Sequence, residues 1–312
     1  MRAVIVTEPG GPEALRVVET AVPEPGPGQV RIRVGAAGVN PVDTAVRAGV
    51  FVQVGVVAER ARYGVGWDAA GVVDAVGAGV TGVAVGDSVV ALLDLLDLEL
   101  GAYAEQLVVD AYAVAPAPRG TDAAHAATLP LNALTADQSL AALALEPGQT
   151  LLVTGAAGAV GGYGVELAAK DRGLRVVAQA GPGDEALVRG LGAAEFVPRD
   201  AVLAAAVRAV APGGVHGVLD AASVGAGALA ALRPRGRFAA VLPSNTPLPL
   251  RGTTVHLTQV YADGARLAEL TALADKGVLT PRVADTLPLE RAAEAHERLA
   301  RGGVRGRLVL VP

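Results

Sequence analysis

The sequence predicts an α/β protein of two domains, a β-rich N-terminal domain followed by a doubly wound parallel sheet. The chain has 312 residues, which suits two domains of ordinary size. Short β-branched runs interrupted by Gly and Pro fill its first part, whereas strand and helix patterns alternate after Gln149. Apolar residues make up 52% of the chain and charged residues 18%, which favours large buried cores over disorder.

The N-terminal domain, expected over residues 1–120, is predicted to be all-β because few of its stretches have helical periodicity. Its strands are expected at Ala3–Thr7, Gln29–Val34, Ala70–Val76, Ser88–Leu92 and Gln106–Val109. The Ala- and Leu-rich segment Thr121–Leu145 is predicted to be a helical bridge to the second domain. Residues 265–312 are expected to return to the first domain, with elements at Arg266–Lys276, Glu290–Arg301 and Leu308–Val311.

The second domain, expected over residues 121–264, shows repeated strand–helix units. Units of this length predict a parallel sheet with helices on both faces. Its strands are expected at Thr150–Thr154, Arg175–Ala178, Glu195–Val197, Gly217–Asp220, Arg237–Val241 and Thr253–Tyr261. Its helices are expected at Val160–Lys170, Asp184–Leu191, Val202–Val210 and Leu229–Leu232.

Charge and composition narrow the possible functions. The net charge of −5 gives no basis for a nucleic-acid-binding face. The chain has no cysteine, which excludes disulfides, thiolate catalysis and thiolate-bound metals. The charged residues Arg2 and Glu8 leave no room for the apolar core of a signal peptide. The uncharged run Pro147–Val165 is interrupted by glycines, which argues against a membrane segment. We therefore expect a soluble, cytoplasmic protein with no membrane segment and no nucleic-acid partner.

A glycine-rich turn stands between a strand pattern and a helix pattern at residues 151–161, which read LLVTGAAGAVG. Gly158 would let the backbone approach a pyrophosphate, and Gly161 would let the helix pack closely on the strand. N–H groups at the helix start would bind the phosphates. This context predicts a Rossmann-type dinucleotide site, the alternative being a structural turn in an alanine-rich protein. The turn residues assigned to the cofactor are Gly155, Ala157, Gly158, Ala159, Val160 and Gly161.

The end of the second strand of this domain bears on the choice between NAD and NADP. An NAD site has Asp or Glu about 20 residues past the last glycine, and Ala180 stands there instead. Without a carboxylate to repel the 2′-phosphate, NADP is favoured. Arg199 could contact that phosphate and Arg189 is a weaker candidate, although either could equally be a solvated surface arginine.

Several further segments stand in a defined order along the chain. They are AGVNPVD at 37–43 with Arg47-Ala48-Gly49, GWDAAGVV at 66–73, GDSV at 86–89, LPLNALTA at 129–136, Val218-Leu219-Asp220, Gly236-Arg237-Phe238 and RGRLVL at 305–310. Together with the glycine turn, they resemble the zinc-independent quinone oxidoreductase (zeta-crystallin-like) branch of the medium-chain dehydrogenase/reductase superfamily along essentially the whole chain.

The resemblance implies a GroES-like β-domain, a Rossmann domain, and NADPH in a cleft, with a small-molecule enone or quinone as the hydride acceptor. It also implies a homodimer, in which Val255–Val260 would pair across the interface. Asn40 would contact cofactor or substrate, although it could instead cap a turn beside Pro41. The other residues assigned to the cofactor are Thr135, by the nicotinamide half, and Val241, Leu242, Pro243 and Asn245, on the loop after the fifth Rossmann strand.

No metal is expected, because zinc-dependent relatives use Cys and His ligands and the four histidines here lack a ligand spacing. Without a Lewis acid, conjugate reduction of an enone is easier than carbonyl reduction. Asp68 is expected to organise its own turn rather than to handle protons.

Two positions depart from the family pattern. Ala45 replaces a tyrosine, so that Tyr63 could serve as the acid, or the pocket could simply be larger and more apolar. Asp184 stands where a lysine is usual after the second Rossmann strand. These departures leave two other hypotheses open, a redox-silent NADPH-binding sensor and a biosynthetic enoyl reductase or cyclase-like relative acting on a bulky enone.

Overall fold

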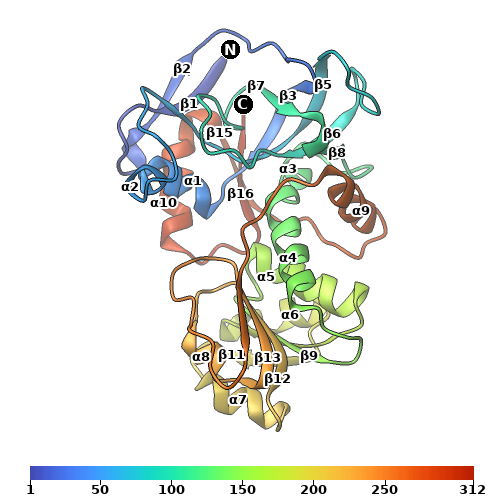
Figure 1. The fold of residues 1–312 in the computed structure, drawn as a ribbon. Helices are drawn as coiled ribbons and strands as arrows, with labels where there is room; N and C mark the ends of the chain where they lie inside the picture. The colour runs from blue at the N-terminus through green and yellow to red at the C-terminus, as the bar shows by residue number, and fades with distance from the viewer. The chain divides into compact units, whose positions relative to one another are not determined.

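The computed structural model describes all 312 residues and divides them into two compact units (Figure 1). Unit 1 comprises residues 1–131, 261–275 and 281–312, and unit 2 comprises residues 132–260 and 276–280. The first division falls after Leu131 rather than after residue 120, so the short helix α3 (Ala123–Ala126) belongs to unit 1. Residues 276–280 interrupt the return of the chain to unit 1.

Unit 1 is built on a three-stranded sheet of order β2-β1-β4 and a larger sheet of order β15-β16-β3-β5-β6-β8, in which β7 also pairs with β3. Most neighbours are antiparallel, whereas β15 and β16 are parallel. The strands are β1 (Arg2–Val6), β2 (Leu15–Glu19), β3 (Gln29–Gly38), β4 (Tyr63–Gly64), β5 (Asp68–Val76), β6 (Ser88–Leu92), β7 (Gln106–Asp110), β8 (Val114–Pro116), β15 (Val283–Pro288) and β16 (Arg307–Val311).

The prediction of an all-β first domain was wrong in part, because two short helices follow β3. These are α1 (Pro41–Arg47) and α2 (Val50–Gln53). Helices of this length are too short to show a periodic pattern, and α1 is instead specified by its N-terminal cap. Unit 1 also contains the short 3₁₀ turns η1 (Pro12–Ala14), η2 (Ala111–Ala113) and η5 (Leu289–Arg291), and the helices α9 (Gly264–Asp275) and α10 (Ala292–Arg301).

Unit 2 contains a six-stranded parallel sheet of order β11-β10-β9-β12-β13-β14. In chain order this is 3-2-1-4-5-6, the doubly wound arrangement in which the strand order reverses between β9 and β12. The strands are β9 (Thr150–Thr154), β10 (Arg175–Ala180), β11 (Glu195–Pro198), β12 (Val215–Asp220), β13 (Leu232–Ala240) and β14 (Thr254–Leu257). The helices are α4 (Pro130–Leu143), which begins in unit 1, α5 (Ala159–Glu166), α6 (Glu185–Leu191), α7 (Leu203–Val210) and α8 (Ala226–Leu229).

The central strands of this sheet are mostly apolar on both faces, as is typical where helices cover both faces of a parallel sheet. Leu152, Val177, Val218 and Phe238 contribute to a fully buried core. The helix predicted at Leu229–Leu232 lies earlier, as α8, and β13 already begins at Leu232. After buried Leu232, residues 233–235 of β13 are exposed and include two arginines, so the hydrophobic pattern of a strand appears only further along the chain.

Two features modify the predicted elements of unit 2. The helix expected to reach Lys170 changes to a π-helical turn at Leu167–Asp171. β14 covers only four residues of the longer β-run predicted at Thr253–Tyr261.

Buried Glu166 accepts hydrogen bonds from the backbone nitrogen (3.0 Å) and hydroxyl (2.7 Å) of Thr280, which fixes residues 276–280 on unit 2. Among the helices, none has both the length and the apolar character required to cross a bilayer.

Candidate functional site

Three loops converge at the carboxyl edge of the unit 2 sheet. Residues 155–158 follow β9, residues 221–225 follow β12 and residues 241–246 follow β13. A Cβ atom built on Gly155 would lie 3.0 Å from the Cβ atom of Ala222, so the first two loops touch. A Cβ atom on Gly225 would lie 2.3 Å from the backbone oxygen of Asn245, so the second and third loops touch as well. Ligands of open α/β sheets bind at this edge, where the strand order reverses.

The glycines of the first loop have separate structural roles. Gly155 has a φ of +60°, in the left-handed region that favours glycine. Gly158 is the N-cap of α5 and has no side chain to cap the first-turn N–H groups. A Cβ atom on Gly161 would lie 2.3 Å from the Gly155 backbone oxygen, so only glycine permits this approach of helix and turn. The predicted strand, turn and helix are therefore present, and no side chain caps the first turn of α5, where helix N–H groups can bind an anion.

Asp220 organises the second loop. Its buried carboxylate accepts hydrogen bonds from the Thr154 hydroxyl (2.6 Å) and from the backbone nitrogens of Val224 (3.0 Å) and Gly225 (2.8 Å). The contacts join the end of β9 to the loop after β12. In the sequence, Asp220 belongs to a family-like segment at the end of an apolar strand, but its partners could not be foreseen from that position.

Hydrogen bonds join the second and third loops through two residues with left-handed backbone, a contact that we call the clasp. Ser223 has a φ of +52° and Asn245 a φ of +61°. The Asn245 side-chain nitrogen donates to the Ser223 backbone oxygen (3.0 Å), and the Ser223 and Ser244 hydroxyls lie 3.2 Å apart. Strained backbone of this kind persists only where surrounding contacts hold it. The predicted cofactor residues Val241, Leu242, Pro243 and Asn245 all lie on this clasped third loop.

The last residue of β10, Ala180, has an uncharged side chain. Ala180 is buried, and its backbone oxygen accepts from the Arg199 nitrogen (2.8 Å), which brings Arg199 next to it. The Arg199 side chain is exposed, whereas Arg189 pairs with Glu185 (2.8 Å) and donates to the Ala194 oxygen. Of the two arginine candidates, Arg199 is thus the one near Ala180 whose side chain is not already in an ion pair.

Asn40, in unit 1, is the N-cap of α1 and is completely buried. Its backbone nitrogen donates to the Asp43 carboxylate (2.7 Å) in a reciprocal capping box, and its side-chain nitrogen donates to Asp68 (2.6 Å). The second carboxylate oxygen of Asp68 accepts from the Leu131 nitrogen (2.6 Å). The capping role that the sequence left open for Asn40 is therefore present in the structure. Asp68 serves as a buried connector between segments.

A second set of buried polar groups continues from Asp43. The Tyr103 hydroxyl donates to the Asp43 carboxylate (3.0 Å) and lies 3.2 Å from His296 Nε2, and His296 Nδ1 lies 3.3 Å from Arg47. Burial raises the pKa of Asp43 to about 7 and that of Asp68 to about 6. Burial also lowers the pKa of His296 to about 3, so this imidazole is neutral near neutral pH. This network was not predicted from the sequence, in which the Asn40-x-x-Asp43 capping spacing is the only local signal for it.

The remaining predicted residues lie in different units. Tyr63, in β4 of unit 1, is buried, and its hydroxyl oxygen accepts from the Arg60 backbone nitrogen (3.0 Å). Thr135 is buried in the unit 2 part of α4. Across the chain, no three side chains of His, Cys, Asp or Glu are grouped in a way that could hold a metal ion.

Two protein families match the chain. Residues 26–119 match the family described as alcohol dehydrogenase GroES-like domain, and residues 191–310 match the family described as zinc-binding dehydrogenase. Among solved structures, an NAD-dependent alcohol dehydrogenase is 33% identical with a TM-score of 0.89, and each chain is covered completely. A mycobacterial protein solved in complex with NADPH is 31% identical with a TM-score of 0.85, again with complete coverage of both chains.

Curated relatives point to the same superfamily. Human quinone oxidoreductase is 30% identical over 336 residues, covering 100% of this chain and 98% of the relative. The 2-haloacrylate reductase of a Burkholderia species is 33% identical over 337 residues, covering 99% and 98%. A segment of pikromycin polyketide synthase component PikAII of Streptomyces venezuelae is 34% identical to 94% of this chain, which spans only 8% of that relative. The chain therefore belongs to the medium-chain dehydrogenase/reductase superfamily, a pyridine-nucleotide-binding family of oxidoreductases, as a relative of the quinone oxidoreductases.

Proposed function

We propose that this protein transfers a hydride from NADPH to an activated C=C bond or a quinone without a metal ion. The observation that carries the proposal is the open first turn of α5 beside the uncharged end of β10. The relatives support the reaction class, because they include quinone oxidoreductases, a 2-haloacrylate reductase and an NADPH-dependent alkenal/one oxidoreductase of Arabidopsis thaliana. A cytoplasmic location remains part of the proposal.

The residues of unit 2 fit a dinucleotide. The pyrophosphate would be held by the backbone of residues 157–161, where glycine leaves the first turn of α5 uncovered. The clasped third loop, with Val241, Leu242, Pro243 and Asn245, would hold the nicotinamide half, together with Thr135. When bound, NADPH supplies the hydride and the protein supplies position and exclusion of water.

Selection of NADPH over NADH would rest on the end of β10. A carboxylate there would accept from the ribose hydroxyls of NAD and repel a 2′-phosphate, and Ala180 can do neither. Arg199 is exposed and adjacent through its backbone, so its guanidinium is the proposed partner of that phosphate. Asp184, buried at the start of α6, is the feature that opposes this assignment.

The proposed reaction is a conjugate reduction. Hydride adds to the β-carbon of the enone, its electron pair displaces the C=C electrons onto the carbonyl oxygen, and a proton then adds to the α-carbon. Asn40 is proposed to position cofactor or substrate. The proton would come from water or from Tyr63, whose hydroxyl already accepts one hydrogen bond from Arg60 and can still donate its own proton.

A biosynthetic reductase or cyclase-like enzyme acting on a bulky enone is the second candidate. The observation that favours it is the match between almost the whole chain and a segment of a polyketide synthase. Ala45 in place of the family tyrosine would suit such a substrate, because it would leave a larger pocket.

We also propose that the protein forms a homodimer through β14. This strand is the last of the sheet and pairs only with β13. Leu248 and Leu250, on the preceding loop, are 81% and 61% exposed. An unpaired strand edge beside exposed leucines favours pairing with a second copy.

The test is NADPH oxidation by the purified chain with a panel of quinones, short enones, bulky enones and saturated aldehydes. The proposal predicts turnover of quinones or enones and none of saturated aldehydes, because hydride addition to an isolated carbonyl lacks a Lewis acid here. Preference for bulky enones would favour the second candidate. Tight binding of NADPH without turnover of any acceptor would favour the redox-silent sensor and contradict the proposed reaction.

A further inference from the structure

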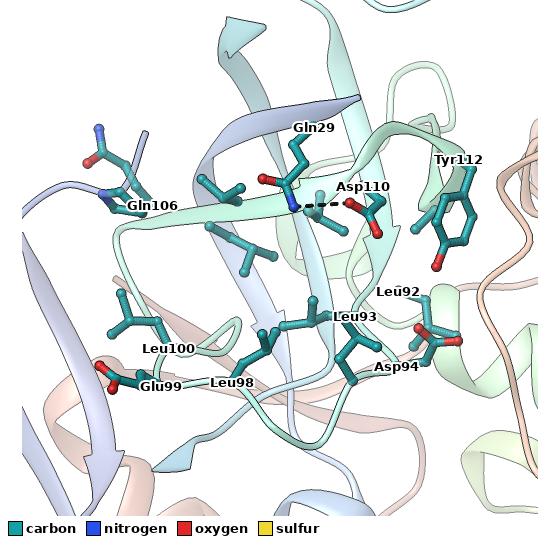
Figure 2. Close-up of a pocket in the computed structure, with 16 residues that line it drawn as sticks. Gln29, Leu92, Leu93, Asp94, Leu98, Glu99, Leu100, Gln106, Asp110 and Tyr112 are labelled. Carbon is teal, nitrogen blue, oxygen red and sulfur yellow. Dashed lines mark hydrogen bonds between the residues drawn. The ribbon is translucent and has the colours of Figure 1, made fainter. Parts of the chain in front are cut away.

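A pocket lies in unit 1 beneath the loop that joins β6 to β7 (Figure 2). Its volume is about 230 Å³, which about eight water molecules would fill in the liquid. None of the residues assigned above to the cofactor or to the reaction lines it. Its walls are mainly aliphatic, and six of the lining residues are Leu92, Leu93, Leu95, Leu98, Leu100 and Leu107.

The charged residues that line this pocket are all acidic. They are Asp94, Glu99 and Asp110, and the lining contains no Lys, Arg or His. Glu99 already has a cationic partner, since it pairs with Arg62 (3.3 Å). Asp94 and Asp110 instead accept from neutral donors, the Ala262 backbone nitrogen (2.7 Å) and the Gln29 side chain (3.1 Å). Two negative charges at the leucine pocket are thus without a counter-charge from the protein.

Tyr112 stands beside these two carboxylates. Figure 2 shows Asp94, Asp110 and Tyr112 together at one side of the pocket and Glu99 at the other. Tyr112 is 61% exposed although it is aromatic. Partial burial raises its pKa, and the charges of Asp94 and Asp110 raise the pKa further, which reflects a negative potential at its hydroxyl. An accessible aromatic ring next to carboxylates is a favourable environment for an organic cation.

We propose that this pocket binds a small organic cation with an apolar body. An ammonium group would lie among Asp94, Asp110 and Tyr112, and the apolar body would contact the leucine walls. The aliphatic walls give such a ligand burial of apolar surface that a hydrated metal ion could not use. The same acidic rim disfavours anions, and a neutral apolar ligand would leave both carboxylates without a counter-charge.

The first test compares three ligands of nearly equal shape, phenylbutylamine, phenylbutanol and phenylbutyrate, on the full chain with ¹³C-labelled leucine methyl groups. The amine is expected to shift the methyl signals of Leu93 and Leu98 and to bind about fivefold more tightly than the alcohol. The carboxylate is expected to bind most weakly. Added salt should weaken the binding of the amine and leave the binding of the alcohol unchanged, since only the amine carries a charge that the carboxylates attract. Equal affinities of amine and alcohol, or shifts confined to other leucines, would overturn the proposal.

The second test removes one charge at a time. Asp94→Asn and Asp110→Asn each keep an oxygen that can accept from Ala262 or Gln29, so the local hydrogen bonds survive. Each variant is expected to weaken amine binding about fivefold and to leave alcohol binding unchanged. Asp200→Asn, an exposed acid of unit 2 that does not line the pocket, is the matched control and should change neither.

A third measurement separates a ligand pocket from a contact between copies. If no ligand moves the leucine methyl signals, and Leu95→Asp changes the mass measured by sedimentation, the pocket is an interface between copies and the proposal is wrong. A mass that is unchanged by Leu95→Asp, together with methyl shifts on the amine, supports it.

Discussion

The Asn245 side chain donates a hydrogen bond to the backbone oxygen of Ser223 (3.0 Å), and both residues have left-handed backbone. Through this contact, the loop after β12 and the loop after β13 hold one another at the carboxyl edge of the sheet. The same two loops approach again at Gly225, where a Cβ atom would lie 2.3 Å from the Asn245 oxygen. The geometry of the proposed nicotinamide site therefore also depends on Ser223 and Gly225, which are not among the residues assigned to the cofactor.

Gly225→Ala tests this dependence. The new methyl group must displace the third loop, and it also occupies a backbone with a φ of +64°. We expect a loss of about 1–3 kcal/mol in the free energy of unfolding and a higher Kd for NADPH. Gly227→Ala is the control, because it lies in α8, where a Cβ atom meets only Val224 at 3.3 Å. Normal NADPH binding by a folded Gly225→Ala variant would show that the clasp does not shape the site.

Cofactor choice gives a second prediction. NADPH should bind more tightly than NADH, and Ala180→Asp should reverse the preference, since a carboxylate accepts from the ribose hydroxyls and repels the 2′-phosphate. Arg199→Ala should weaken NADPH binding about fivefold to tenfold and leave NADH binding unchanged. Arg189→Ala is the matched control. Calorimetric titration of the wild type and the three variants with both cofactors measures all eight dissociation constants, and a wild-type preference for NADH would contradict the assignment.

The proton donor gives a third prediction. A positioned acid contributes about 10²–10⁴-fold to the rate, so Tyr63→Phe should lower kcat/KM by less than about tenfold if water donates the proton. A larger loss would identify Tyr63 as the acid. Asn40→Ala should reduce kcat/KM more than Tyr63→Phe does, because a metal-free site depends on positioning.

Asn40→Ala also removes the cap of α1 and the donor to Asp68, so its thermal stability must be measured beside its activity. We expect it to lose about 1 kcal/mol or more of stability. An Asn40→Ala variant that is less stable but fully active would leave Asn40 with the capping role alone.

The buried carboxyls predict a pH dependence of stability. The pKa of Asp43 is raised to about 7 and that of Asp68 to about 6, so the folded protein keeps protons that the unfolded chain has released. Stability from these groups is therefore present at low pH and is lost as the pH rises through their folded pKa values. His296 acts oppositely, because its pKa is lowered to about 3 and its contribution is lost as the pH falls below the unfolded value of 6.5. Between pH 4 and 6 the two carboxyls outweigh the one imidazole of this network, so the stability that the network contributes should fall as the pH rises.

Urea unfolding at several pH values across this range measures the effect. Asp43→Asn should flatten the profile, since the amide mimics the protonated carboxyl at every pH. A profile for Asp43→Asn that has the same slope as the wild type would show that Asp43 does not hold a proton in the folded state.

Metal removal gives a fifth prediction. Dialysis against a chelator should leave the melting temperature and the rate of NADPH oxidation unchanged, since the sequence offers no zinc ligand set. Stoichiometric zinc in the purified protein, lost together with activity, would contradict the metal-free mechanism.

The parts of the fold that the sequence predicts well are those that contiguous residues determine. The turn at Gly155–Gly161 could be found because strand, glycines and helix follow one another directly. β15 was missed, because its residues are mostly exposed and it lacks an apolar alternation. Its identity as a strand comes from pairing with β16, and no local pattern shows this.

The buried network around Asp43 illustrates the same limit at the level of a site. Tyr103 and His296 are separated by 193 residues, and the structure places the Tyr103 hydroxyl 3.2 Å from the His296 ring nitrogen. Neither residue stands in a recognisable motif. Only the tertiary arrangement shows that the cap of α1 is continued by a chain of polar groups through the core of unit 1.

The division of the chain between the units has a consequence for biosynthesis. The large sheet of unit 1 includes β15 and β16, which are synthesised after every strand of unit 2, whereas all six strands of unit 2 are complete once Leu257 has emerged. Unit 2 can therefore assemble its sheet during translation, while the end of β3 in unit 1 must wait for its partner β16. Until β16 has been made, the end of β3 at Ala37 and Gly38 lacks this partner, so unit 1 exposes unpaired backbone groups there that could pair with another chain.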